Sequence, residues 1–186
     1  MPRHTKEDKL IELPIKQVKQ INLCGCGLAA LEMVLRYRGA HVSQFDFLRS
    51  DRRLRKRVER EDSSGLSEAA IGVLALERGF KVSLYGKKLR VSKTFLKLGG
   101  KVIRKEMSKQ LLLELLKDGI PPIVKVPNAG EAYGKEEGRI PHYVVVKGTH
   151  HDGSFDVADP WYEKEISREY WDRWSSNVVA VEGRIR

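Results

Sequence analysis

The chain has 186 residues, of which 41% are hydrophobic and 32% are charged, so we expect one folded domain with a buried core and exclude intrinsic disorder. No stretch approaches the roughly 20 consecutive apolar residues that span a bilayer, and the N-terminus lacks the apolar run of a signal peptide. We therefore expect a cytoplasmic protein with no membrane segment.

The net charge is +10, and the basic residues are unevenly distributed. Residues 81–105 contain nine basic and no acidic side chains, and residues 49–61 contain seven basic and three acidic ones. Such a surface favours acidic partners, including nucleic acid, although a solvated basic face is the simpler explanation. Few Asn and Gln beside many Lys, Arg and Glu indicate a thermophilic source.

The strongest local signal is a helix over residues 26–38. Apolar residues recur at helical spacing, few polar positions interrupt them, and Gly39 suits the C-terminal stop. We expect this helix to be central and buried.

Other elements are expected on both sides of this helix. Helices precede most strands in the chain, which favours an α+β fold with an antiparallel sheet. In chain order we expect an extended arm at 10–15, one helix opened by Ser43 and Asp46 that carries the basic run of 49–61, a helix at 67–78, a strand at 80–85 and a short helix in the basic segment. A strand at 102–105, a helix at 108–117, a strand at 121–126 and a long loop at 127–141 follow. The last elements are strands at 142–148, 154–160 and 164–167, a short helix at 167–174 and a strand at 177–182.

Two cysteines lie one residue apart, Cys24 and Cys26, and a disulfide between them would close a small, strained ring. Cys26 falls in the first turn of the predicted helix, where unpaired N–H groups favour a reactive thiolate. Gly27 would leave space beside the sulfur for a substrate backbone. The alternative is a small buried residue that begins a core helix.

A zinc site is a poor explanation for these cysteines. Cys-x-Cys with the adjacent His150 and His151 does not have the ligand spacing of structural zinc sites. We expect both histidines to be exposed turn residues, and we expect no metal or cofactor.

The hairpin HYVVVKG-THHD-SFDVADP supplies a candidate histidine and carboxylate. A turn centred between its two middle histidines would place Val146 opposite Phe155 and His142 opposite Asp159, within side-chain reach. A carboxylate beside an imidazole orients an acid–base histidine. A structural His–Asp pair, or an aspartate that only ends its strand before Pro160, would explain the same pattern.

Gln20 lies six residues before Cys26. A side-chain amide there can stabilise an oxyanion together with the Cys26 backbone N–H. Taken alone the signal is weak, because a surface glutamine is the commoner case.

The run QINLCGCGLAALEMVLRYRG, followed by PHYVVVKG and FDVADP, resembles the papain-like cysteine peptidases. Within them it is most similar to the bacteriocin-processing peptidases, which are leader-cleaving domains of bacterial ABC exporters, and to their free-standing relatives. The resemblance spans about residues 15–182, and the matching positions are Gln20, Cys26, Gly27, Ala29, Leu31, Tyr37, Gly39, His142, Tyr143, Val144, Val145, Asp159 and Pro160.

The resemblance implies a single papain-like domain over residues 1–186, with a helical half packed on an antiparallel sheet. It also implies a peptide substrate, Cys26 as nucleophile, His142 as base and acid, Asp159 as its orienting group and Gln20 as oxyanion donor. The loop 127–141 is longer than the resemblance leads us to expect. Its three glycines between two prolines, and its end beside His142, predict an insert that gates the cleft, and a disordered surface insert is the alternative. Cys24 is outside the family pattern, and we expect a buried neighbour or a redox partner of Cys26.

Several alternatives stay open at this level. An inactive peptide-binding relative would share the fold, and a basic nucleic-acid-binding protein would share the charge. No helix-turn-helix, RNP-like or finger motif is present, which makes the nucleic-acid alternative less favoured. Hydrolysis and acyl transfer to an amine would use the same residues, and the oligomeric state is not determined.

Overall fold

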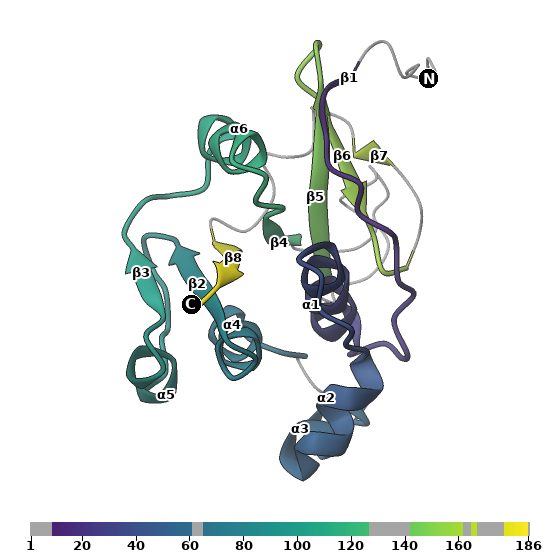
Figure 1. The fold of residues 1–186 in the computed structure, drawn as a ribbon, viewed down its shortest axis with the longest axis vertical. Helices are drawn as coiled ribbons and strands as arrows, with labels where there is room; N and C mark the ends of the chain where they lie inside the picture. Colours follow the sequence, from purple (N-terminus) through teal and green to yellow (C-terminus); the bar gives the residue numbers. More distant parts are fainter. Residues whose placement is uncertain (1–8, 61–64, 127–141, 162–164, 167–176, 186) are drawn as a thin grey trace.

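The computed structural model describes residues 9–60, 65–126, 142–161, 165–166 and 177–185 (Figure 1). The loop predicted at 127–141 and the helix predicted at 167–174 lie outside these residues. The described helices are α1 (Cys26–Tyr37), α2 (Gln44–Ser50), α3 (Arg52–Val58), α4 (Glu68–Leu76), α5 (Lys93–Lys97) and α6 (Lys109–Lys117). The described strands are β1 (Lys9–Glu12), β2 (Phe80–Tyr85), β3 (Lys101–Ile103), β4 (Ile123–Val126), β5 (His142–His150), β6 (Phe155–Ala158), β7 (Glu165–Ile166) and β8 (Val178–Arg184).

These strands form one sheet in the order β3-β2-β8-β4-β5-β6-β7, and β1 pairs with β5. Helix α1 contacts β5, and α4 contacts β2 and β8, so the helical layer lies against the middle of the sheet (Figure 1). The α+β architecture is as predicted. None of the described helices is long and apolar enough to cross a membrane.

Helix α1 confirms the strongest sequence signal. Ten of its 12 residues are buried, and the chain leaves it through Gly39 at φ +80°. Inside the helix Arg36 forms an ion pair of 2.6 Å with the buried Glu32. A helix with apolar side chains on nearly every side must be buried by other elements on nearly every side, and α1 is buried in this way.

We had predicted that one helix carries the basic run of 49–61. The run instead divides between α2 and α3. The predicted capping box of Ser43 and Asp46 is present at the start of α2. Asp51 then adopts an extended backbone (φ −136°), and its side chain accepts hydrogen bonds from the N–H groups of Arg53 and Leu54. A second N-cap therefore interrupts the helix.

The sheet is antiparallel except for one pair. β2 and β3 run parallel and are connected through α5, the kind of crossover that a parallel pair requires. The expected antiparallel sheet therefore contains a parallel pair in this part of the chain.

Strand β5 organises the half of the sheet that carries the candidate site. One of its edges pairs with β4 over residues 142–145 and with β1 over residues 148–150, while the other edge pairs with β6. Eight of its nine residues are buried. His142, at its first position, is paired with Val126 of β4, and this pairing holds its backbone in place.

The register of β5 and β6 differs from the predicted one. Val146 lies opposite Val157 rather than Phe155, and a bulge follows in β5. Since β6 ends one residue before Asp159, that residue and His142 are not a cross-strand pair. Their side chains nevertheless meet, through the turn that follows β6.

The hairpin loop explains the shift. The N–H of His150 donates to the carbonyl of Ser154 at 3.0 Å, so three residues form the loop, and Gly153 takes the left-handed conformation (φ +87°) that such a loop needs. Only His151 is exposed, as predicted. His150 is buried and bonds to Asp156 at 2.9 Å, which contradicts the expectation of two exposed turn residues.

Candidate active site

Cys26 is the first residue of α1. Gly25 occupies the N-cap position without a side-chain cap, and the first turn carries no acidic residue. Neither position therefore carries a side chain that neutralises the positive end of the helix.

His142 links Cys26 to Asp159. Its Nε2 lies 2.7 Å from Oδ1 of Asp159, and its ring is also hydrogen-bonded to Cys26. All three residues are buried. The structure thus brings together three of the four predicted site residues, although they lie up to 133 positions apart in the sequence.

The surroundings of His142 favour its protonated form. Burial alone would lower its pKa, but the hydrogen bonds to Asp159 and Cys26, together with their negative charge, outweigh burial and raise the pKa to about 9. His142 therefore holds a proton at neutral pH, and an imidazolium beside the sulfur stabilises a thiolate.

Two residues that the sequence did not single out hold Asp159 in place. The backbone N–H of Trp161 donates to its Oδ1 at 2.6 Å, and the amide of Gln17 donates to its carbonyl at 2.6 Å. The first contact is the local turn that aspartate forms with the residue two positions later, so the Asp159-Pro160-Trp161 sequence carries a signal for it. The second contact joins distant segments and has no local signal.

Gln20, the fourth predicted residue, lies at the edge of this site. Its backbone N–H donates to the carbonyl of Pro160 at 3.0 Å, and its side-chain amide donates to the carbonyl of Asn22 at 2.6 Å. Its Oε1 is buried without a hydrogen-bond partner. The amide that was predicted to meet an oxyanion is therefore directed at the chain before Cys26 in this structure.

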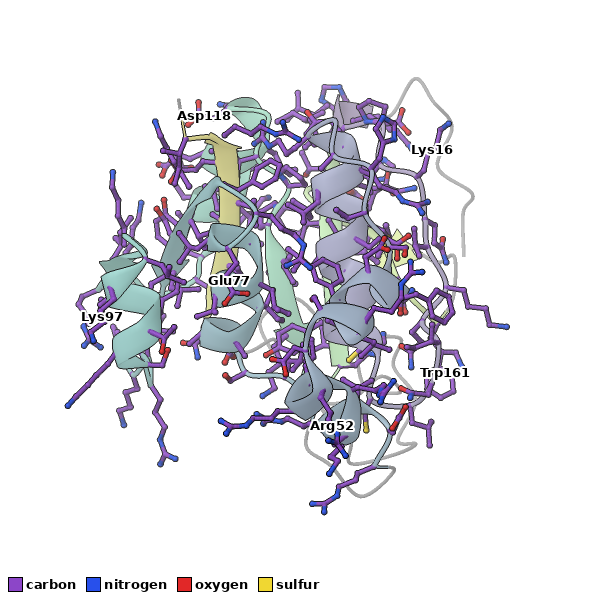
Figure 2. All side chains as sticks on the ribbon, turned by 60° about the horizontal axis from the view of Figure 1, so that its bottom comes forward. Lys16, Arg52, Glu77, Lys97, Asp118 and Trp161 are labelled. Atoms are coloured by element: carbon purple, nitrogen blue, oxygen red, sulfur yellow. The ribbon has the colours of Figure 1, made fainter. Side chains whose placement is uncertain are left out.

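A cavity of about 450 Å³ adjoins these residues. Gln20, Leu23, Pro160 and Trp161 contribute to its walls. Figure 2 shows Trp161 at the surface of the molecule. The cavity places open space beside the turn that carries Asp159.

Cys24 is directed away from His142. Its Sγ is 3.3 Å from the carbonyl of Arg60, and its backbone N–H donates to Oδ1 of Asn22. It is buried, as predicted, and no disulfide joins it to Cys26. The two thiols therefore have different surroundings although only one residue separates them.

Gly27 has a different role from the one expected. A Cβ at this position would lie 3.1 Å from Cδ1 of Ile71 and 3.4 Å from the ring of Tyr143. The missing side chain thus leaves room for core residues rather than for a substrate. Tyr143 is itself fixed by a 3.0 Å hydrogen bond to the carbonyl of Leu66, and burial raises its pKa, so its hydroxyl stays neutral.

Metal-ligating residues do not gather in the part of the chain that the structure describes. No group of three or more His, Cys, Asp or Glu side chains there could hold a metal ion. His150, which the zinc hypothesis needs, is paired with Asp156 at the end of β5 opposite to His142.

Comparison with solved structures shows the same fold in peptidase domains. The peptidase domain of Streptococcus ComA, a bi-functional ABC transporter involved in quorum sensing, is 20% identical, with a TM-score of 0.58 over 91% of this chain and 99% of that chain. A C39-like peptidase from Bacillus anthracis is 18% identical (TM-score 0.62, 96% and 99%). A double glycine motif protease from an AMS/PCAT transporter, in complex with the leader peptide, is 17% identical (TM-score 0.60, 94% and 95%).

A search of curated proteins finds no match. The family model described as the Peptidase_C39 like family matches residues 12–179, which include all four candidate site residues. These neighbours and this match confirm the papain-like fold that the motifs predicted, and the chain belongs to the Peptidase_C39 like family.

Proposed function

We propose that this protein is a cysteine peptidase in which Cys26 is the nucleophile, His142 the acid and base, and Asp159 the orienting carboxylate. The observation that carries the proposal is the hydrogen-bonded series Cys26–His142–Asp159 at the start of the buried helix α1. We also propose that residues 1–186 form one peptidase domain, with its core at about 15–182.

The reaction follows from these positions. The Cys26 thiolate attacks the peptide carbonyl carbon, and the C–N bond breaks as His142 gives its proton to the leaving amine. The acyl group then remains on Cys26 as a thioester. A water molecule attacks the thioester while His142 takes up its proton, and the C–S bond then breaks, which releases the acid and restores the Cys26 thiolate beside a protonated His142.

The oxyanion would be stabilised by the backbone N–H of Cys26, which lies in the first helical turn and has no partner within the helix. Gln20 would be the second donor. Its amide must first leave the carbonyl of Asn22, so we expect its contribution to depend on a side-chain rotation that substrate induces.

A peptide is the proposed substrate. One similar structure is a double glycine motif protease in complex with the leader peptide, and its fold is shared by this chain. We therefore expect cleavage after small residues, with Gly-Gly as the first sequence to test. If an amine rather than water reaches the thioester, the same residues perform acyl transfer.

The test uses peptides that contain Gly-Gly and compares Cys26→Ala with Cys24→Ala. Cys26→Ala should abolish cleavage, while Cys24→Ala should keep most of it, because Cys24 is directed at Arg60. Both thiols are buried, so Cys24→Ala is a matched control. Activity that survives in Cys26→Ala would exclude Cys26 as the nucleophile, and peptide binding without cleavage by the wild type would identify an inactive relative.

A further inference from the structure

A second cavity, of about 650 Å³, lies at the other end of α1. Its walls come from the arm that follows β1, from the last turns of α1 and from the connection to α2. Met33, Tyr37 and Val42 provide apolar surface, and Lys16, Arg36 and His41 stand at its exposed side. The cavity does not include any of the proposed catalytic residues.

Arg36 is held in position at this cavity. One nitrogen of its guanidinium pairs with Glu32 at 2.6 Å, and Nε donates to the carbonyl of Val42 at 3.2 Å. Glu32 is in turn buried and accepts from the N–H of Gln44 at 2.8 Å. About half of the Arg36 side chain stays exposed, so N–H donors remain available in a fixed orientation.

The acceptors at the cavity are already engaged. Asp46, its acidic wall residue, accepts from the N–H and hydroxyl of Ser43 at 2.8 and 2.7 Å and pairs with Arg49. Two carbonyls in the last turn of α1 are also used, because the N–H groups of Gly39 and Ala40 donate to those of Arg36 and Leu35. The cavity therefore offers donors and positive charge, which suit a carboxylate.

The arm leads from this cavity to the active site. Lys16 lines the 650 Å³ cavity, Gln17 bonds to the carbonyl of Asp159, and Gln20 lines the 450 Å³ cavity. Figure 2 shows Lys16 and Trp161 on the same side of the molecule, toward opposite ends of it. Twelve helical residues rise about 18 Å, a length that about five or six extended residues cover.

We propose that the cavity formed by Lys16, Arg36, His41, Met33, Tyr37 and Val42 binds an acidic and partly apolar segment of the substrate, five to seven residues C-terminal to the cleaved bond. The direction follows from the chemistry. The leaving amine must face His142, and the arm is hydrogen-bonded to Asp159 and Pro160 on that side. The inference rests on the proposed peptidase function and specifies its substrate.

The experiment compares two peptides with the same Gly-Gly sequence and the same neutral spacer. One carries Leu-Glu pairs five to seven residues after the cut, and the other carries Leu-Gln at those positions. Selectivity is the ratio of their kcat/KM values, and we expect about fivefold for the wild type, the effect of one or two exposed ion pairs. This ratio should fall as salt is added.

Lys16→Glu should bring the ratio to about one, and His41→Gln should lower it. The matched control is Lys97→Glu, which makes the same charge change at an exposed position on the opposite side of the molecule (Figure 2). Lys97→Glu should keep the wild-type ratio. Melting temperatures verify that each variant folds.

Binding separates this inference from the proposed function. The two peptides, labelled with fluorescein, are titrated with the Cys26→Ala protein, and the Kd of the Leu-Glu peptide should be about fivefold lower than that of the Leu-Gln peptide. In the double variant Cys26→Ala, Lys16→Glu the two Kd values should be equal. If the wild type cleaves nothing but binding shows this ratio, the proposed function fails, while the preference of the cavity for an acidic segment stands. Equal kcat/KM and equal Kd for the two peptides would overturn the inference, and selectivity only for an acid placed before the cut would overturn its direction.

Discussion

Two histidine–aspartate pairs lie at opposite ends of β5, and they differ in their third partner. His142 and Asp159 are 2.7 Å apart beside Cys26, whereas His150 and Asp156 are 2.9 Å apart, with Lys9 on the second carboxylate oxygen at 2.8 Å. A lysine neutralises the second aspartate, and a thiol stands beside the first histidine. The neighbouring residue, rather than the pair itself, separates a catalytic arrangement from a structural one.

Asp159→Asn should alter the pH dependence of catalysis. Asp159 and Cys26 together raise the pKa of His142 to about 9 against the effect of burial, so the wild type should keep a protonated His142, and hence kcat/KM, until the pH passes about 9. Without the carboxylate's charge, the basic limb of the kcat/KM profile should move to lower pH, and kcat should fall by about 10²-fold or more.

The measurement is a pH–rate profile of both proteins with one Gly-Gly peptide. Asp159→Asn retains shape and hydrogen bonding, so a folded variant with an unchanged profile would show that the aspartate only ends its strand.

The same shift predicts how stability depends on pH. His142 has a folded pKa of about 9, above its usual 6.5, so its contribution to stability is complete below about pH 6.5 and is lost as the pH rises through about 9. His142→Gln cannot lose this contribution. Urea unfolding of both proteins at pH 6 and pH 9.5 should show the larger decrease in the wild type, and equal decreases would contradict the raised pKa.

At the scale of elements, a buried ion pair adds to the backbone pairing of β1 with β5. Lys9 reaches Asp156, which is 1% exposed, and also Glu12 at the end of the same strand. Burial alone would raise the pKa of Asp156, but the hydrogen bonds from Lys9 and His150 lower it, so it stays charged. The ion pair therefore joins the N-terminal strand to the hairpin of β5 and β6.

Lys9→Met should reduce the free energy of unfolding by about 1–3 kcal/mol, because it leaves a buried carboxylate without its cation. Lys81→Met is the control, since Lys81 is exposed on β2 and should cost little. Denaturant unfolding measures both. A loss no larger than that of Lys81→Met would mean that β1 is held by its backbone pairing with β5 alone.

At the scale of the molecule, the net charge of +10 should affect how substrates approach. A basic surface attracts acidic peptides, and salt screens that attraction. Between about 50 and 500 mM salt, kcat/KM for an acidic Gly-Gly peptide should fall about threefold or more, while that of a neutral peptide should change little. Parallel salt responses for the two peptides would show that the charge does not steer substrates.

The nucleic-acid alternative gives a different result in the same salt series. A labelled DNA duplex would bind with a steep salt dependence, and peptides would not be cleaved. DNA binding without any peptidase activity would make the basic surface the main functional feature.

The sequence by itself determined the elements that local interactions specify. Helical periodicity and Gly39 predict α1, the pair Ser43 and Asp46 predicts the start of α2, and Cys26 falls in the first turn as expected. The motifs also predicted the family and the α+β fold. Capping, periodicity and motif spacing involve residues within a few positions of one another, so they can be recognised without coordinates.

The tertiary structure alone decided the rest. The β5–β6 register, the parallel pairing of β2 with β3, the burial of His150, the contact of Gln17 with Asp159 and the position of the Gln20 amide were mispredicted or not anticipated. All of these except the Gln20 amide, which bonds to Asn22 two residues away, depend on segments that meet only after folding. A three-residue loop and a bulge changed the register while His142 and Asp159 still met, because buried polar groups must find hydrogen-bond partners in whichever register the core selects.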